Sequence, residues 1–339
     1  MNPVPHFLLS LVFAVAATVA AASPSLVNPL VKQRADPHVT RDAKGYYYFT
    51  ATVPEYDRIE LRRSRSLNGL GTAPAKVVWR QHASGPMSAN IWAPELHRIG
   101  GKWYLYFTAG RADAPFDVRL YVLENAATNP LEGKWVERGQ LKTGWESFAL
   151  DATTFALKGQ RYLAWAQRPP GASKHMSALY IARMDTPLSI EGPAVLLTEP
   201  EYAWEKVKFD VTEAPAVLVK NGRVFMTYSA SATDANYAMG LLVAKDSANL
   251  LDASSWTKSR EPVFASSAAT SQYGPGHNAF TTSADGKTSI LVYHARDYRD
   301  IEGEPLLDPN RHTRVQAISW KQDGMPDFGI PGADASGQR

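Results

Sequence analysis

The stretch that decides the fold runs from Gly101 to Gly110 and reads GKWYLYFTAG. A glycine in a turn, followed by a run of aromatic and β-branched or aliphatic residues, is typical of a β-hairpin. The same pattern occurs five times, and its turn glycines are Gly45, Gly101, Gly159, Gly222 and Gly286. Successive glycines lie 56, 58, 63 and 64 residues apart. The chain therefore contains an internal repeat of about sixty residues.

A third apolar run follows each hairpin, as DVRLYVLE does after the second one. No segment keeps a 3.6-residue period, so few helices are expected. Sandwiches and barrels place strands about every 8 to 12 residues without a higher repeat, whereas a unit repeated five times favours a propeller. The sequence predicts an all-β fold, a five-bladed β-propeller, over residues 28–331. The alternative is two unrelated β domains whose hairpins resemble each other by chance.

Both ends of the chain lie outside this repeat. Residues 7–22 form an unbroken run of apolar and small residues that closes on alanines. This pattern predicts a signal peptide over residues 1–22 that is cleaved near Ala22, with an uncleaved N-terminal anchor as the alternative. We therefore expect a secreted or periplasmic protein with no membrane segment after cleavage. Residues 332–339 (GADASGQR) predict a flexible tail.

The composition excludes several classes of protein. With no cysteine, the chain has no disulfide, thiolate metal site or cysteine nucleophile. Its 36 Lys and Arg balance 33 Asp and Glu, for a net charge of +3, so we expect no nucleic-acid partner. The motifs of serine hydrolases, nucleotide-binding loops and zinc peptidases are absent as well. We expect a globular monomer.

The repeat also predicts which residues lie at the centre of the molecule. The first strand of each propeller blade lines the central channel, so residues eight or nine positions before each hairpin glycine should converge there. These residues are Asp36, Trp92, Asp151, Glu213 and His277. Any one of them alone could be a turn, cap or core residue. Three acids in a shared register indicate chemistry, because burying a carboxylate is costly unless it is paired or functional.

Carboxylates placed across a pocket indicate glycoside hydrolysis. One ionised and one protonated acid are the minimum for that reaction, and a third acid nearby raises the pKa of the proton donor. A sugar also packs against aromatic rings, which Trp92, Phe148 and Tyr273 could supply near the inner strands. The alternative from another class is a carbohydrate-binding propeller without catalysis.

These motifs resemble glycoside hydrolase family 43, whose members are five-bladed propellers that act on arabinose- and xylose-containing polysaccharides. The matching motifs are ADPHV, LDATTF, TEAPAV and GPGHNAF with YHAR, and the resemblance runs from about residue 34 to residue 331. The stretches EYDRIELRRS and DPNRHTRVQAISWKQDGMPDFGIP look like the exo-acting α-L-arabinofuranosidase branch, which trims arabinan from its ends.

The resemblance implies a role for each matching residue. Asp36 would be the general base, Glu213 the general acid, and Asp151 the group that orients Glu213 and raises its pKa. His277 would lie in the sugar site near the axis, close to a calcium or other structural ion, and Arg296 would bind sugar hydroxyls. No cofactor would be needed for the chemistry, and the partner would be an arabinose-containing polysaccharide or oligosaccharide.

The resemblance further implies inversion at the anomeric carbon, so we expect the Asp36 and Glu213 carboxyls to lie about 6.5 to 9.5 Å apart. The α-1,5 linkage is the expected target. A β-xylosidase, an endo-arabinanase and a non-catalytic sugar-binding propeller stay open as alternatives. Retaining propellers that act on fructosides use an Arg-Asp-Pro motif, which is absent here. One departure is Ala214, which stands where many relatives have glycine.

Overall fold

The computed structural model describes residues 25–335, and this part of the chain is almost entirely β-structure. Four short 3-10 turns are its helical elements: η1 (Asn68–Leu70), η2 (Ala203–Glu205), η3 (Ala253–Ser255) and η4 (Ala268–Thr270). The prediction of an all-β fold is confirmed. Within residues 25–335 no helix is long and apolar enough to cross a membrane. The predicted signal peptide, residues 1–22, lies outside the described residues.

The strands form five successive antiparallel groups. The first group contains β1 (Ala35–Arg41), β2 (Tyr47–Thr52), β3 (Arg58–Ser64) and β4 (Lys76–Arg80). The second contains β5 (Ala89–Ile99), β6 (Lys102–Arg111), β7 (Ala114–Asn125) and β8 (Val136–Gln140). In each group the strands pair in chain order, as hairpins joined by short turns require.

The third group contains β9 (Ala149–Leu157), β10 (Gln160–Gln167), β11 (Met176–Thr186) and β12 (Ser189–Thr198). The fourth contains β13 (Asp210–Lys220), β14 (Arg223–Ala230), β15 (Ala238–Lys245) and β16 (Thr257–Lys258). A short parallel contact between β11 and β13 joins these two groups. The fifth group contains β17 (Tyr273–Thr282), β18 (Ser289–Arg296) and β19 (His312–Ala317), and a small hairpin of β20 (Ser319–Trp320) and β21 (Pro326–Asp327) follows it.

The five predicted hairpin glycines all lie in turns with positive φ. Their φ angles are +81° at Gly45, +86° at Gly101, +84° at Gly159, +70° at Gly222 and +73° at Gly286. Glycine adopts this left-handed conformation at little cost because it has no Cβ. Each of these turns leads from the first to the second strand of a group, so the repeat read from the sequence is the structural repeat.

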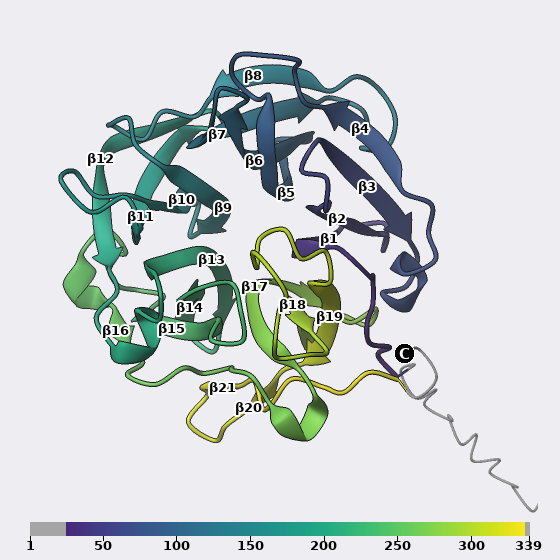
Figure 1. Cartoon of the computed structure of the whole chain (residues 1–339), viewed down its shortest axis with the longest axis vertical. Coiled ribbons are helices and arrows are strands. Elements are labelled where there is room, and N and C mark those ends of the chain that lie inside the picture. Colours follow the sequence, from purple (N-terminus) through teal and green to yellow (C-terminus); the bar gives the residue numbers. More distant parts are fainter. Residues whose placement is uncertain (1–24, 336–339) are drawn as a thin grey trace, which may run out of the picture.

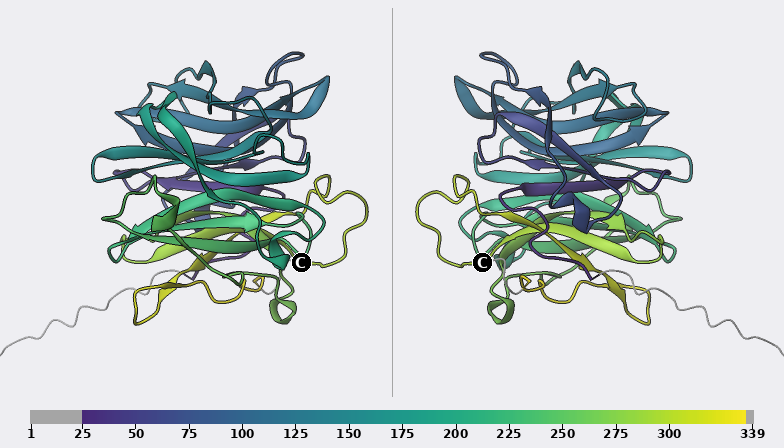
Figure 2. Two further views of the ribbon diagram at one scale, coloured as in Figure 1. Left: turned by 90° about the vertical axis from the view of Figure 1, so that its left-hand side faces the viewer. Right: turned by 90° about the vertical axis from the view of Figure 1, so that its right-hand side faces the viewer.

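The groups are arranged around a common centre, and the first strand of each group lies innermost (Figure 1). Five hydrophobic clusters fill the spaces between neighbouring groups: the first with the second, the second with the third, and so on to the fifth with the first. Side views show the loop between β18 and β19 standing out from one face of the molecule (Figure 2).

The start of the chain completes the fifth group. Residues 28–31 run alongside β19, where the amide of Leu30 donates to the carbonyl of Thr313 at 2.8 Å and the amide of Thr313 donates to the carbonyl of Val31 at 2.9 Å. The side chain of Asn28 donates to Val315 O at 3.0 Å and accepts from Val315 N at 2.8 Å. Segments from opposite ends of the described chain, residues 28–31 and β19, therefore lie side by side, and Figure 1 shows the purple N-terminal segment passing close to the fifth group.

The expectation of a flexible tail over residues 332–339 is wrong for its first four residues. Gly332 donates its amide to the side chain of Gln316 at 3.0 Å, and Ala335 donates to the carbonyl of Asn28 at 2.8 Å. The carboxylate of Asp334 pairs with the buried Arg314. The polar composition of residues 332–335 is typical of a solvated end, but these contacts attach the segment to the fifth group. Residues 336–339 lie outside the described residues.

Candidate active site

A cavity of about 1220 Å³ opens where the inner strands begin. Asp36 from β1, Asp151 from β9, Glu213 from β13 and His277 from β17 line it together. The structure thus brings together three acids that lie 62 to 177 residues apart in the sequence. The loop that follows β18 forms another wall, with residues 299–306 facing the cavity.

Each inner strand begins with a bulge that aims its side chains into this cavity. The pairing register shifts at that point in all five strands. A residue with positive φ lies at each shift: Asp36 (50°), Ala93 (45°), Asp151 (57°), Ala214 (53°) and His277 (42°). Bulges commonly redirect side chains near functional sites.

The bulges correct the register that was counted from the sequence. Asp36, Asp151 and His277 occupy the left-handed position itself, whereas Trp92 and Glu213 each lie one residue before it. The left-handed residue lies eight positions before the hairpin glycine in some groups and nine in others. A count of eight or nine residues from the glycine therefore could not reveal this difference. The five residues reach the same cavity although only three of them are structural equivalents.

Asp36 is held as an anion by its neighbours. Its Oδ1 lies 3.3 Å from Nη1 of Arg311, 3.3 Å from Nδ1 of His277 and 3.3 Å from Nδ1 of His294. Burial by itself would raise the pKa of this carboxyl, but Arg311 and the two histidines hold the pKa well below its ordinary value. A carboxylate that stays ionised at neutral pH is suited to act as a base.

Asp151 and Glu213 have the opposite tendency. Burial, together with the charges of Glu213 and Asp36, raises the pKa of Asp151 well above its ordinary value. Burial also raises the pKa of Glu213 to about 7, although the Tyr237 hydroxyl, which donates to its Oε1 at 2.7 Å, opposes that rise. Asp151 Oδ2 in turn accepts the Ala214 amide at 3.1 Å, which ties it to the residue after Glu213. At neutral pH the pair holds a proton opposite an ionised Asp36.

His277 lies between the acids. Its Nδ1 is 3.3 Å from Asp36 Oδ1 and 3.8 Å from Asp151 Oδ2, and its backbone amide donates to Ser229 Oγ at 2.8 Å. Burial lowers the pKa of this imidazole. Among the described residues, the side chains close enough to share a metal ion do not include His277. An ion at His277 stays a prediction.

The three predicted aromatic residues, Trp92, Phe148 and Tyr273, all line the cavity. The ring of Trp92 packs against Tyr56 and Phe116, with centroid distances of 5.8 and 5.9 Å. Its indole Nε1 is buried and has no hydrogen-bond partner within residues 25–335. Phe116, whose surface is 61% exposed, also lines the cavity, and no sequence motif indicated it.

Arg296 does not line the cavity, so the expectation that it binds sugar hydroxyls is corrected. It is buried, and its guanidinium donates to the carbonyls of Thr233 at 2.9 Å and Pro305 at 2.7 Å. Arg296 thereby supports two segments of the cavity wall from behind. Three arginines line the cavity, Arg168, Arg299 and Arg311, and Arg311 is the one that contacts Asp36. Arg311 lies in the DPNRHTR stretch, which resembles the family, but the sequence alone assigned no role to a single residue of that stretch.

Comparison with known proteins identifies the family. The model of glycosyl hydrolases family 43 matches residues 26–326, nearly all of the described chain. The chain belongs to glycosyl hydrolase family 43. The resemblance read from the motifs is therefore confirmed, and the cavity acids are those of a family 43 chain.

Similar family members are known from bacteria and a fungus. An extracellular exo-α-(1->5)-L-arabinofuranosidase of Streptomyces avermitilis is 58% identical over 93% of this chain and 66% of its own length. Alpha-L-arabinofuranosidase 43 of Humicola insolens is 53% identical over 97% of this chain and 68% of its own. The chain thus spans about two thirds of these relatives. The crystal structure of an α-L-arabinofuranosidase from Lactobacillus brevis, 50% identical, superposes with a TM-score of 0.89 over 91% of this chain and 98% of that one.

Proposed function

We propose that this protein is an exo-acting α-L-arabinofuranosidase that releases arabinose from arabinan or arabino-oligosaccharides, with α-1,5 linkages as the target. The observation that carries the proposal is the ionised Asp36 in one cavity with a proton held by Glu213 and Asp151. This pairing is what glycoside hydrolysis requires. The names of the most similar relatives support the choice of sugar and linkage.

We infer that the five strand groups are the blades of a five-bladed propeller. The five hydrophobic clusters support this inference, because each joins two consecutive groups and the last joins the fifth group to the first. The pairing of residues 28–31 with β19 supports it further, since it supplies the fifth group with a fourth strand. Ring closure leaves short, protected strand edges.

The reaction follows from the charges of the three acids. Asp36 takes a proton from a water molecule while the water oxygen attacks the anomeric carbon. Glu213 donates its proton to the glycosidic oxygen as the bond from that oxygen to the anomeric carbon breaks. Asp151 fixes the backbone beside Glu213 through the Ala214 amide, while burial and the charge of Asp36 raise the pKa of Glu213. Attack and departure on opposite faces give an inverted sugar.

Two assays test the activity and the mechanism. An aryl α-L-arabinofuranoside and an aryl β-D-xyloside, offered side by side, should show cleavage of the first, and a preference for the xyloside would make the protein a β-xylosidase. Linear arabinan should yield arabinose and not long oligomers, which an endo-arabinanase would release. NMR of the first sugar formed should show the β anomer, and the α anomer would contradict inversion.

The proposed general acid, Glu213, and the proposed general base, Asp36, can be distinguished by substitution. Glu213→Ala should lose most activity on arabino-oligosaccharides but much less on aryl arabinosides, because a good leaving group needs little protonation. Asp36→Ala should abolish hydrolysis of both substrates, because the attacking water then has no base. Steady-state kinetics on both substrates measure this difference. Equal losses for both variants on both substrates would argue against the assigned roles.

We also propose an exported monomer that needs no cofactor for its chemistry. The names of two Streptomyces relatives describe extracellular enzymes, which supports export. N-terminal sequencing of the mature protein from the secreting cell would locate the cleavage site, which we expect near Ala22. Light scattering would give the mass in solution, which should be that of one chain.

A further inference from the structure

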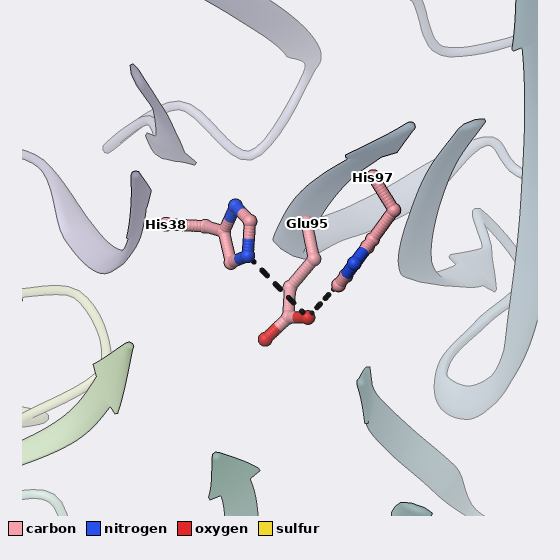
Figure 3. Close-up of side chains that lie close together, drawn as sticks. All are labelled: His38, Glu95 and His97. Carbon is pink, nitrogen blue, oxygen red and sulfur yellow. Dashed lines mark hydrogen bonds and ion pairs between the residues drawn. The ribbon is translucent and has the colours of Figure 1, made fainter. Parts of the chain in front are cut away.

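A second cluster of titratable side chains lies beside the catalytic cavity. His38 is two residues beyond Asp36 on β1, and Glu95 and His97 are on the adjoining β5. These three side chains line a separate cavity of about 310 Å³ whose lining does not include the catalytic acids. Figure 3 shows the carboxylate of Glu95 between the two imidazole rings. The proposed reaction uses none of the three.

The atoms that face one another in this cluster are all metal-ligating atoms. Oε2 of Glu95 lies 2.7 Å from Nε2 of His97 and 3.8 Å from Nε2 of His38, and one such atom from each residue lies within 4.8 Å of the others. The side chains are 11% (His38), 11% (Glu95) and 15% (His97) exposed. The donors are therefore enclosed by protein but border a cavity in which water could complete a coordination shell.

We propose that His38, Glu95 and His97 form a binding site for a divalent transition-metal ion, with Zn²⁺ as the best fit. Two imidazoles and one carboxylate, with a position left for water, are a common ligand set for zinc and its first-row neighbours. Calcium fits poorly, because it takes six to eight oxygen ligands. This site differs in residues and in chemistry from the ion expected at His277, and it does not depend on the proposed sugar specificity.

The present geometry needs small side-chain movements to hold an ion. Zinc bonds of about 2.0–2.2 Å place tetrahedral ligands roughly 3.3–3.5 Å apart, so Glu95 and His97 must separate slightly and His38 must approach. His38 has a further cost, because its Nδ1 now accepts the Leu96 amide at 3.3 Å. Ligation through Nε2 places the ring proton on Nδ1 and breaks this contact. His97 and Glu95 are thus the stronger ligands and His38 the weaker one.

Such an ion would connect two groups of strands near the centre of the molecule. His38 belongs to the first group and the other two ligands to the second. Because a preformed site exists only in the folded chain, bound metal should raise the unfolding temperature. Without a metal the same residues would form a hydrogen-bonded cluster, and in that case Zn²⁺ would have no effect on unfolding.

The experiment is a titration of the chelator-treated full chain with Zn²⁺ by calorimetry at neutral pH, together with thermal unfolding and the absorption spectrum of bound Co²⁺. We expect one equivalent of Zn²⁺ to bind, the unfolding temperature to rise, and Co²⁺ to give the intense visible bands of a tetrahedral site. Glu95→Gln and His97→Gln should each weaken binding more than about tenfold, and His38→Gln should weaken it less.

Two control variants locate the ion. His82→Gln removes one member of an exposed histidine–carboxylate pair, His82 with Glu137 at 2.9 Å, and should leave binding unchanged. Asp36→Asn should also retain the ion, because the catalytic acids are not ligands. Absence of Zn²⁺ binding by the unsubstituted chain overturns the proposal. So does binding that survives Glu95→Gln and His97→Gln or that disappears with Asp36→Asn.

Discussion

At the residue scale, Asp36 and Glu213 share one cavity but differ in charge because they face different neighbours. The charge of the Arg311 guanidinium holds the pKa of Asp36 low, whereas burial raises the pKa of Glu213 to about 7. Tyr237 moderates that value, because its hydroxyl donates a hydrogen bond to the carboxylate and so favours the ionised form. The Tyr237 hydroxyl therefore lowers the pKa of Glu213, although burial outweighs it.

Tyr237→Phe should move the alkaline limb of the kcat/KM profile on arabino-oligosaccharides to higher pH. Without the hydroxyl, the pKa of Glu213 rises from its value of about 7, so that the carboxyl stays protonated at higher pH. Tyr106→Phe is the matched control, since that hydroxyl donates to the carbonyl of Pro187 and not to a cavity acid. A limb that stays in place or moves to lower pH would refute this role of Tyr237.

The three acids could be predicted from the sequence because each lies at a fixed distance before a recognisable hairpin. Arg311 and Tyr237 could not, because they follow irregular loops whose path depends on the packing of neighbouring groups. The expectation that Arg296 binds sugar hydroxyls is wrong for a related reason. Its place at the end of β18 is correct, but the direction of its side chain is set by the carbonyls of Thr233 and Pro305, which no local pattern reveals.

At the element scale, the bulge at the start of each inner strand links fold and chemistry. Asparagine, aspartate and histidine tolerate positive φ better than most residues, so the left-handed position suits Asp36, Asp151 and His277. The same position is occupied by alanine in β5 and β13. The methyl side chain of alanine makes no polar contact there, although the Ala93 and Ala214 amides donate to Thr52 Oγ1 and Asp151 Oδ2.

A pair of glycine substitutions in β13 tests the strain at that bulge. Ala214 has a φ of 53° and Ala216 lies in extended strand, while both side chains are buried. Both changes lose a methyl group and add freedom to the unfolded chain, but only Ala214→Gly removes left-handed strain. It should therefore be less destabilising than Ala216→Gly by about 1–2 kcal/mol. Urea unfolding measures the difference, and equal destabilisation would mean that position 214 is unstrained.

At the scale of the whole molecule, the repeat predicted the five groups of strands but not which segment pairs with β19 in the fifth group. The hairpin motif accounts for β17 and β18, and the run after it for β19. The segment that lies beyond β19 comes from the opposite end of the chain, at Asn28 to Val31. These residues are too few and too irregular to predict a strand by themselves, because their β-pairing is decided by a partner 282 residues away, from Val31 to Thr313.

Asn28→Ala should destabilise the protein by about 1–3 kcal/mol. The change leaves the buried amide and carbonyl of Val315 without the side chain that now pairs with both. Asn68→Ala is the control, because Asn68 also joins the N-terminal segment through its side chain but does so at the surface, with Ser25 O and Val27 N. That change should cost no more than about 0.5 kcal/mol. Equal urea midpoints for Asn28→Ala and the unsubstituted protein would show that Asn28 contributes nothing to the pairing of residues 28–31 with β19.

The contact between residues 28–31 and β19 also determines when folding can be completed during synthesis. Residues 28–31 are synthesised long before their partners Thr313 and Val315, so the fifth group cannot be completed until translation has passed Val315. A chain that stops earlier or is clipped there presents the open edge of β18 to solvent. Exposed strand edges are templates for pairing between molecules. Truncation before Val315 should therefore produce aggregates and not a smaller folded protein.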